Sequence, residues 1–487
     1  MRPSIPDDGL PPSQRVWAVL ALVFAVGMSA LDSSIGNTAL PTIAAEMHAS
    51  PASSIWVVNA YQLSVVVSLL PFASLGEIFG YRRVYILGLV VFTIGSLACA
   101  LAWSLPTLIA ARVLQGFGAS GIMSVNTALV RFIYPSRSLG RGVGFNALVV
   151  GVSTAAGPSV AAAVLSVAPW QWLFAVNVPF GLVAFGLALR ALPATPRASH
   201  RFDLASALLN AACLGLLIFG IGEAAHSADH LVVALVLTGA VVAGVLLVQR
   251  QLSLTAPLLP VDLYRRPMFA LSSATAMCSF TAQGLAFVSL PFYFQTTLGH
   301  SAVETGMLLT PWPAATALMA PIAGPLSDRF PPAILGGIGM ALLCLGLGLM
   351  AGLPAHPSTL DIVGRMLVCG AGFGFFQSPN LKAIMSAAPP QRSGSASGIV
   401  ATSRLLGQSL GAALVALCFG IAAQRGPELA LVLGAGFSGV ASLVSFSRLL
   451  PGKPDSATLA AVSVDQRVPT GEAYVTGEQR GRGDAGR

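Results

Sequence analysis

The amino-acid sequence predicts an all-helical polytopic membrane protein with about 14 transmembrane helices, arranged as six, then two, then six. The first reason is composition: hydrophobic residues make up 55% of the chain and charged residues only 9%, whereas soluble domains carry about 25% charged residues. The second is that the apolar residues form runs of about 20, the length of helix that crosses a bilayer. The third is a repeat, because charged residues of the first half recur in the second half at a nearly constant spacing.

The predicted spans lie between two polar ends of the chain. Residues 1–14 are rich in Pro, Ser and Asp, and residues 451–487 collect Gly, Asp, Glu and Arg, so we expect a disordered arm and a disordered tail. The first apolar run is too long for a signal peptide, and we expect it to be retained. By the length criterion the spans are residues 16–38, 54–75, 84–104, 106–130, 141–165, 172–192, 204–222, 231–250, 268–292, 302–323, 333–353, 360–381, 395–423 and 429–449.

Lysine and arginine residues are concentrated on one side of the predicted membrane. All but four of the 26 lie in the two terminal segments or in loops that follow even-numbered spans. The exceptions are Arg425, in an odd-numbered loop, and Arg112, Arg365 and Arg404, inside spans. Because positively charged loops stay in the cytoplasm, both termini are predicted to be cytoplasmic, and the protein to lie in the cytoplasmic (inner) membrane. The net charge of +8 is spread over these loops, so no nucleic-acid partner is predicted.

Two pairs of charged residues recur at similar spacings. Glu77 follows the second span and Asp328 follows the tenth, 251 residues later. Arg112 lies in the fourth span and Arg365 in the twelfth, 253 residues later. Parallel repeats of this kind are typical of transporters built from two related bundles. Since six helices and their loops take about 200 residues, the spacing leaves a two-helix insert. The predicted parts are a cytoplasmic arm (1–14), a six-helix bundle (15–200), the insert (201–255), a second six-helix bundle (256–450) and a cytoplasmic tail (451–487).

Asp32 lies inside the first apolar run, within the segment Leu31–Pro41. A charged carboxylate at membrane depth is costly, so such a group faces a protein-lined or watery interior. Ser29, Asp32 and Gly36 share one face of a helix, and we expect that face to point away from lipid. Two interpretations are open. We favour a protonatable group on a transport pathway over an aspartate that caps a helix end at the membrane interface.

The three arginines inside predicted spans need acceptors, because arginine does not deprotonate in proteins. Asp32 is a candidate partner for Arg112, directly or through water, and the alternative is that Arg112 binds backbone carbonyls. Asp361 precedes Arg365 by four residues, a spacing that favours an ion pair within one helix. For Arg404 two interpretations are open: attraction of an anionic group on a substrate, or extension of the side chain toward the cytoplasm.

Charged loops at two cytoplasmic helix ends are candidates for a gate. Glu77 lies near Arg82 and Arg83 in the loop after the second span, and a charge network there can latch two halves and break when they rock. The alternative is ordinary cytoplasmic loop charge. The predicted gating residues in the two related loops are Gly76, Glu77, Gly80, Arg82, Arg83, Gly324, Asp328 and Arg329.

Small residues in the fifth predicted span suit a pivot where the halves meet. Gly151 and Gly157 permit close approach of helices, and Pro158 bends the helix. The six cysteines lie in apolar runs without the spacing of a metal site, so no metal is expected. No nucleophile–base constellation and no phosphate-binding loop is recognised, and neither an enzyme nor an ATP-driven pump is predicted.

Several of these segments carry a resemblance to a known family. The sequence resembles the major facilitator superfamily, and within it the 14-helix drug/proton antiporters, over nearly all of residues 15–450. The similar segments are Leu31–Pro41 (LDSSIGNTALP), Trp56–Tyr61 (WVVNAY), Arg112–Gly118 (RVLQGFG), Gly157 with Pro158, Trp170–Gly181 (WQWLFAVNVPFG) and Leu290–Gly299 (LPFYFQTTLG). Departures from the family motifs are Ser34 and Gly36 in the first segment, Ala73, Ile78 and Tyr81 around the loop after the second span, and Ala161 and Ala162 in the fifth span.

The resemblance implies a major facilitator fold and a proton-coupled antiporter. Such a protein exports amphipathic drugs or other toxic organic compounds by alternating access, with the proton motive force as its energy source and without a cofactor. Asp32 and Arg112 are the implied proton-coupling pair. The candidate cavity residues are Asn37, Asn59, Tyr61, Gln62, Phe287, Tyr293, Gln295 and Arg404.

Other functions stay open at this stage. A dedicated metabolite exporter or a proton-coupled importer has the same fold, and a non-transporting membrane sensor is less favoured because no folded cytoplasmic domain is visible. The expected partners are the lipid bilayer, protons and a small molecule, with a monomer expected and a periplasmic adaptor with an outer-membrane channel left open. Asp32 is the one acid placed near the middle of a span, so monovalent lipophilic cations and neutral amphiphiles are expected as substrates before dications.

Overall fold

The computed structural model describes residues 9–135, 138–198, 202–224, 230–254, 261–388, 393–422 and 424–449. These residues are almost entirely helical, and no strand occurs among them. The predicted tail (451–487) and the first eight residues of the predicted arm lie outside the described part. The first helix begins at Pro12, inside the predicted arm, because proline is favoured at the first position of a helix.

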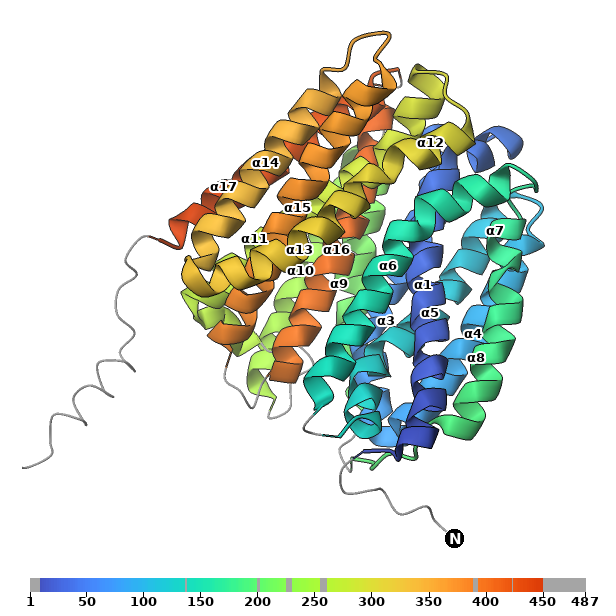
Figure 1. Cartoon of the computed structure of the whole chain (residues 1–487), viewed down its shortest axis with the longest axis vertical. Coiled ribbons are helices and arrows are strands. Elements are labelled where there is room, and N and C mark those ends of the chain that lie inside the picture. The colour runs from blue at the N-terminus through green and yellow to red at the C-terminus, as the bar shows by residue number, and fades with distance from the viewer. Residues whose placement is uncertain are drawn as a thin grey trace, which may run out of the picture. The chain divides into compact units, whose positions relative to one another are not determined.

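The helices form three consecutive sets along the chain (Figure 1). The first set, called the N-terminal half, contains α1 (Pro12–Glu46), α2 (Pro51–Ser54), α3 (Trp56–Phe79), α4 (Tyr81–Ala100), α5 (Leu105–Ile133), α6 (Leu139–Leu165), α7 (Trp172–Ala175) and α8 (Asn177–Ala191). The second set is the hairpin of α9 (Leu204–Glu223) and α10 (His230–Ser253). The third set, called the C-terminal half, contains η2 (Val261–Arg265), α11 (Pro267–Phe292), η3 (Tyr293–Thr297), α12 (Ala302–Leu309), α13 (Pro311–Arg329), α14 (Pro332–Ala351), α15 (Thr359–Ala387), α16 (Ser393–Ile421) and α17 (Gly426–Ser447).

In the described part, 13 helical segments are long and apolar enough to cross a membrane. They correspond to the predicted spans with one exception, the tenth. That span is divided at Thr310 into the short α12 and the longer α13, which begins with Pro311 and contains Pro321 and Pro325. Proline cannot donate the backbone hydrogen bond that would continue α12 into α13, which explains a break at this point.

The predicted repeat is visible in the packing of glycines. A Cβ atom at Gly88 on α4 would lie 2.8 Å from the backbone of Gly121 on α5. A Cβ atom at Gly339 on α14 would lie 2.7 Å from the backbone of Gly372 on α15. Each residue of the second pair follows its counterpart by 251 residues, the spacing that separates Glu77 from Asp328. Close backbone contact at equivalent helix pairs therefore repeats at the spacing that the charged residues predicted.

The α9–α10 hairpin packs on one side of the other helices. α9 contacts α3 of the N-terminal half and α16 of the C-terminal half, whereas α10 contacts α9 and η2. Asn210 of α9 donates a hydrogen bond to the Val67 carbonyl of α3 at 3.0 Å. At the end of the hairpin that holds both chain connections, Arg250 Nη2 lies 2.9 Å from Asp203 Oδ1.

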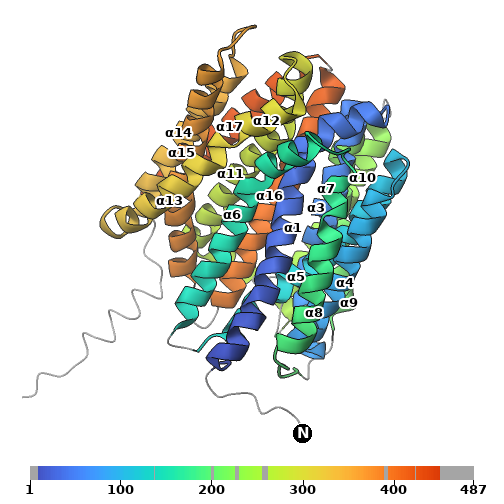
Figure 2. The ribbon, with the colours of Figure 1, turned by 45° about the vertical axis from the view of Figure 1, so that its right-hand side comes forward.

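The described part of the chain contains four clusters of buried apolar residues, and three of them show how the two halves are built and joined. One cluster is built mainly from α1, α3, α4, α5 and α8, and a second from α11, α14 and α15. A third joins the two halves through Leu40 and Val58 on one side and Val288, Phe292 and Ala412 on the other. Seen from two directions, α6 of the N-terminal half lies beside α12 of the C-terminal half, and α1 lies beside α6 (Figures 1 and 2). The two halves therefore meet where α6 contacts α12.

Candidate functional site

Asp32 on α1 and Arg112 on α5 form an ion pair inside the N-terminal half. Arg112 Nη1 lies 2.6 Å from Asp32 Oδ2, and each side chain is only 1% exposed. The sequence left open whether the partner of Arg112 is a carboxylate or a backbone carbonyl. The structure shows both, because Arg112 Nε also donates to the Val57 carbonyl on α3 at 3.1 Å. The pair is direct, and Asp32 lies within α1 (Pro12–Glu46), so it does not cap an end of that helix.

Two amide side chains complete the surroundings of the carboxylate. Gln115 Nε2 donates to Asp32 Oδ1 at 2.9 Å, and Asn177 Nδ2 donates to the same oxygen at 2.7 Å. Gln115 also accepts a hydrogen bond from Arg112 Nη1 at 2.6 Å and donates to Ser96 Oγ at 2.8 Å. The Asp32 carboxylate therefore accepts hydrogen bonds from one guanidinium and two amides.

Aromatic rings cover the Arg112 guanidinium. Its Cζ atom lies 4.1 Å from the centre of the Tyr61 ring and 5.4 Å from the centre of the Phe174 ring. Tyr61 is held in turn by a hydrogen bond from its hydroxyl to the Ser29 carbonyl at 3.3 Å. Gly36 of α1 lies beside the arginine, since a Cβ atom there would be in ordinary contact with Arg112 Nη2 at 3.5 Å. Tyr61, predicted to line a cavity, is therefore part of the ion-pair site.

Gln115, Asn177 and Ser96 were not selected from the sequence. Gln115 follows Arg112 by three residues, so it lies on the same helix face, and this spacing was a usable signal. Asn177 is an amide in the apolar stretch Trp170–Gly181, which was recognised only as part of a motif. Nothing in the sequence indicates that α4 and α8 bring Ser96 and Asn177 to the same carboxylate.

The buried pair is suited to couple a proton to a structural change. Protonation of Asp32 would remove one charge and leave Arg112 buried without its counter-ion. Breaking a buried ion pair by losing one partner costs on the order of 3–5 kcal/mol. Protonation is therefore favourable only together with a rearrangement that supplies Arg112 with other acceptors or with water.

The two halves are joined near the ends of their helices that lie away from the Asp203–Arg250 end. Gln295 Nε2 donates to the Thr38 carbonyl at 3.4 Å, and Ser159 Oγ lies 2.8 Å from Thr310 Oγ1. The third apolar cluster, which contains Phe292, Phe419 and Leu40, lies at the same ends. These contacts are called the outer seal below, because the orientation predicted from the sequence places them on the outer side of the membrane. The name covers Thr38–Gln295, Ser159–Thr310 and that cluster.

Two of the three predicted pivot residues lie at close contacts between helices. A Cβ atom at Gly157 would overlap the Ser34 side chain of α1. Next to it, the Pro158 carbonyl lies close to Gly306 of α12, where a Cβ atom would be only 2.5 Å away. Gly151 differs from Gly157, since no atom of the described residues lies within 4 Å of a Cβ atom built at Gly151. Gly157 and Pro158 thus lie between α1 and α12, whereas Gly151 makes no close approach.

In the two predicted gating loops, the contacts described next run within one half. Gly80 has a φ of +96°, which glycine adopts without strain, and it ends α3 and begins α4. Tyr81 N donates to Thr195 Oγ1 at 2.9 Å, and Arg82 donates to the Leu189 carbonyl. In the related loop, Lys382 Nζ lies 2.5 Å from Asp328 Oδ1. Among the other predicted gating residues, Arg83 and Arg329 are exposed. Gly76 packs against Val125, whereas no described atom lies within 4 Å of a Cβ atom built at Gly324. A latch between the halves stays a prediction.

The remaining predicted cavity residues lie in two environments. Asn37, Asn59 and Gln62 have buried side-chain oxygens with no hydrogen-bond donor in the described part of the chain. In the C-terminal half, the Phe287 ring lies 5.1 Å from the Trp312 ring, while Tyr293 is buried. Asp361 and Arg365 form the predicted ion pair at 2.8 Å.

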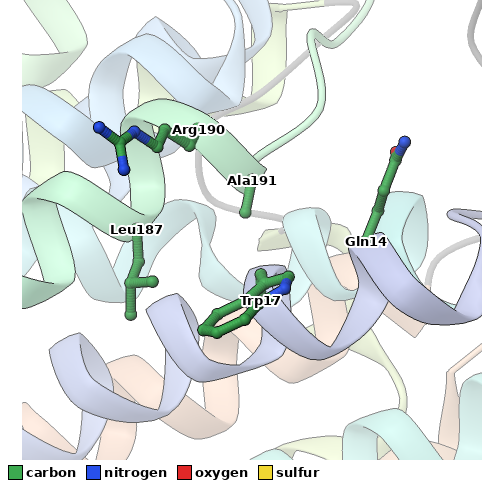
Figure 3. A pocket seen from close by; sticks show the side chains of 5 residues that line it. All are labelled: Gln14, Trp17, Leu187, Arg190 and Ala191. Carbon is green, nitrogen blue, oxygen red and sulfur yellow. The ribbon is translucent and has the colours of Figure 1, made fainter.

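A surface cavity of about 310 Å³ lies away from these residues, between α1 and α8. Figure 3 shows the Trp17 ring of α1 beneath Leu187 and Ala191 of α8, with Gln14 and Arg190 at the sides. Trp17 is 56% exposed, so this is an open surface hollow. None of the predicted cavity residues line it.

Comparison with known proteins gives a consistent result. The family profile named Major Facilitator Superfamily matches residues 22–412. An uncharacterized transporter of Escherichia coli strain K12, YebQ, is 54% identical over 92% of this chain and 98% of its own length. The riboflavin transporter RibZ of Clostridioides difficile is 31% identical over 83% of this chain and 89% of its own length. The tetracenomycin C resistance and export protein of Streptomyces glaucescens is 33% identical over 82% of this chain and 75% of its own length.

A solved structure supports the fold. The bacterial homologue of the human lysosomal transporter Spinster, crystallised in an inward-facing and unoccupied conformation, superimposes with a TM-score of 0.65. The similarity covers 90% of this chain and 97% of that chain, at 16% sequence identity.

Proposed function

The chain belongs to the major facilitator superfamily, and we propose that it is a proton-coupled antiporter that exports amphipathic organic compounds across the cytoplasmic membrane. In this proposal it belongs with the 14-helix drug/proton antiporters, works as a monomer and keeps both termini in the cytoplasm. The observation that carries the proposal is the buried Asp32–Arg112 pair, since an intramembrane ionisable group marks an ion or proton pathway by default. The similarity to a tetracenomycin C resistance and export protein supports the direction of transport.

The segment of α1 after Asp32 offers a route from protonation to gating. Ser34 Oγ donates to the Thr154 carbonyl of α6 at 2.9 Å. The Thr38 carbonyl, a further turn along α1, accepts the hydrogen bond from Gln295 of the outer seal. A shift of α1 that follows loss of the Asp32–Arg112 pair therefore acts on α6 and on the seal together. Alternating access requires such a link between the proton site and a gate.

The proton gradient supplies enough energy for this work. One charge that moves down a membrane potential of 100 mV releases about 2.3 kcal/mol. Since about 1.4 kcal/mol corresponds to a tenfold ratio, this alone sustains an outward concentration gradient on the order of 50-fold.

A dedicated metabolite carrier is the second candidate. It is favoured by one observation, the similarity to a riboflavin transporter over 83% of this chain. The fold and the proton site would be the same in both cases. Only the range of substrates and the direction of flux separate the two functions.

Transport in everted membrane vesicles tests the proposal. The interior of such vesicles corresponds to the outside of the cell, so a proton-driven exporter accumulates its substrate inside and dissipates the pH gradient. The panel should hold chemically diverse amphipathic compounds together with riboflavin. Accumulation of several unrelated compounds supports the proposal, whereas accumulation of riboflavin alone supports the dedicated carrier. No compound-dependent loss of the pH gradient in any arm would reject proton-coupled export.

A further inference from the structure

Arg404 on α16 differs from Arg112, Arg365 and Arg448, three other arginines of the helical bundle, which all have polar partners. It is partly exposed, and in the described part of the chain it has no hydrogen-bond or ion-pair partner. Arg112 and Arg365 each pair with an aspartate. Arg448, at the end of α17, donates to Ser272 Oγ at 2.9 Å and to Asn380 Oδ1 at 3.1 Å. A guanidinium cannot lose its charge, so Arg404 needs an acceptor from outside the described side chains.

The neighbours of Arg404 on α16 show that it does not face lipid. On a helix, residues 404, 408 and 411 share one face. Gln408 Nε2 donates to Gln283 of α11 at 3.1 Å, and a Cβ atom at Gly411 would lie 2.5 Å from the Thr281 carbonyl of α11. Leu405, the next residue, belongs to the apolar cluster of the N-terminal half. The Arg404 face of α16 therefore lies between α11 and the N-terminal half.

Arg404 also lies on the cytoplasmic side of the outer seal. On the same helix, Ala412 and Phe419 belong to the seal cluster. At about 1.5 Å per residue these positions are about 12 and 22 Å further along the helix axis. A compound that enters between the halves from the cytoplasm would meet Arg404 before it met the seal.

Aromatic side chains follow Arg404 along this path. Gln283, the partner of Gln408, precedes Phe287 by one helical turn. The partly exposed Phe287 packs against Trp312, whose indole Nε1 is buried without an acceptor in the described part of the chain. The order along the interface is thus a cation, two amides and one partly exposed aromatic ring, Phe287, which suits a molecule with a charged end and an aromatic body.

The other charged candidate for substrate binding is occupied. Both oxygens of Asp32 accept hydrogen bonds from Arg112, Gln115 and Asn177, and the side chain is 1% exposed. A cationic substrate would have to displace Arg112 from this site. The expectation of cationic substrates rested on Asp32 as the available mid-span charge, and the geometry does not favour it.

We propose that Arg404 binds the carboxylate of an amphipathic aromatic monoanion, which makes organic anions the preferred substrates of the transporter. A planar guanidinium matches a carboxylate with two parallel hydrogen bonds, and such charge-assisted bonds are about twice as strong as neutral ones. Phe287 contacts the aromatic body of the same molecule, and the buried Trp312 ring supports Phe287 from behind. This inference rests on the proposed transport function and names the substrate class for it.

Binding of three probes with one aromatic body tests the assignment. The probes are 2-naphthylacetate, its neutral amide and 2-naphthylmethylammonium, titrated against the purified full-length chain in lipid nanodiscs by calorimetry. The anion is expected to bind at least about tenfold more tightly than the amide, because it alone pairs with Arg404. In Arg404→Gln this preference should fall to about twofold or less, and in Arg404→Lys only part of it should remain, because lysine keeps the charge but not the paired geometry.

The control variant is Arg425→Gln, which removes a charge from the outer loop before α17. It should leave the preference for the anion unchanged, and melting temperatures confirm that each variant is folded. Tightest binding of the cation, equal binding of anion and amide, no binding of the anion, or an unchanged preference in Arg404→Gln would each overturn the assignment. Binding needs no proton gradient, so an anion preference that depends on Arg404 would stand even if proton-coupled flux were absent.

Discussion

Asn177, in the first turn of α8, donates a hydrogen bond to Asp32 of α1 across 2.7 Å, although 145 residues separate the two. The bond brings a neutral donor to a carboxylate that already has a charged one. Two amides and one guanidinium therefore hold the ionised form of Asp32 in place. A proton that arrives at this carboxylate competes with all three donors.

The first prediction concerns the charge of Asp32. Asp32→Asn keeps the shape of the side chain and removes titration, so proton release on addition of a substrate should vanish in proteoliposomes. Downhill movement of the same compound without a proton gradient should remain detectable. Asp361→Asn is the matched control, because Asp361 also pairs with an arginine but lies outside this network. Normal proton-driven efflux in Asp32→Asn would contradict the assigned role.

The second prediction concerns the stability of the ion pair. Arg112→Gln leaves a buried carboxylate without its counter-ion and should lower the free energy of unfolding by about 3–5 kcal/mol. The double variant Arg112→Gln with Asp32→Asn removes both charges and should recover at least half of that loss. Thermal and denaturant unfolding in detergent micelles measure both effects. A double variant less stable than either single variant would show that the two charges are not the main partners of each other.

Much of this site follows from physical rules that act locally. Apolar length and the distribution of Lys and Arg are properties of short segments, and they predicted the helices and the repeat. The Asp361–Arg365 pair was predicted because four residues are one helical turn. The Asp32–Arg112 pair was predicted because two opposite charges in apolar runs each need a partner.

The remaining features depend on which helices are neighbours. Ser96 and Asn177 are neutral residues in apolar runs, and neutral residues have no comparable need for a specific partner. Gly151 and Gly157 look alike in the sequence, yet only Gly157 contacts another helix closely. The division of the tenth span at Thr310 was also missed, because the length criterion counts apolar residues and does not weigh the proline that follows.

The third prediction concerns the hydrogen bond from Asn177 to Asp32. Asn177→Leu removes this bond from the carboxylate and leaves the charges unchanged. A hydrogen bond to a charged group contributes about 1.5–3 kcal/mol, so the free energy of unfolding should fall by about that amount, and proton-coupled flux in reconstituted vesicles should fall as well. Asn210→Leu, which removes the bond from α9 to the Val67 carbonyl, should leave the proton-coupled flux unchanged. Unchanged proton-coupled flux in Asn177→Leu would contradict a role for this bond in transport.

The fourth prediction uses a carboxylate outside the membrane spans. Burial alone would raise the pKa of Asp203, but hydrogen bonds from Arg250 and Ser206 outweigh it and lower the pKa to about 2. A lowered pKa means that this group stabilises the fold above the ordinary value of about 4. Its contribution is lost as the pH falls through about 2. Asp203→Asn should lower the melting temperature at pH 7, and the difference from the parent chain should vanish near pH 2. An equal difference at both pH values would mean that the effect is not electrostatic.

The last prediction separates the two glycines of the proposed pivot. Gly157→Ala places a methyl group against Ser34 of α1, so α6 must move away from α1 or the Ser34 side chain must rotate and give up its bond to the Thr154 carbonyl. Overpacking of this kind costs about 1–3 kcal/mol. Since the same part of α6 contacts α12 through Pro158, we expect the substrate flux to fall at least about tenfold. Gly151→Ala is the matched control on the same helix, where nothing lies within 4 Å, and it should keep nearly full flux. Flux in reconstituted vesicles, normalised to folded protein, decides between them. Equal losses in the two variants would show that general flexibility of α6, and not its contact with α1, controls transport.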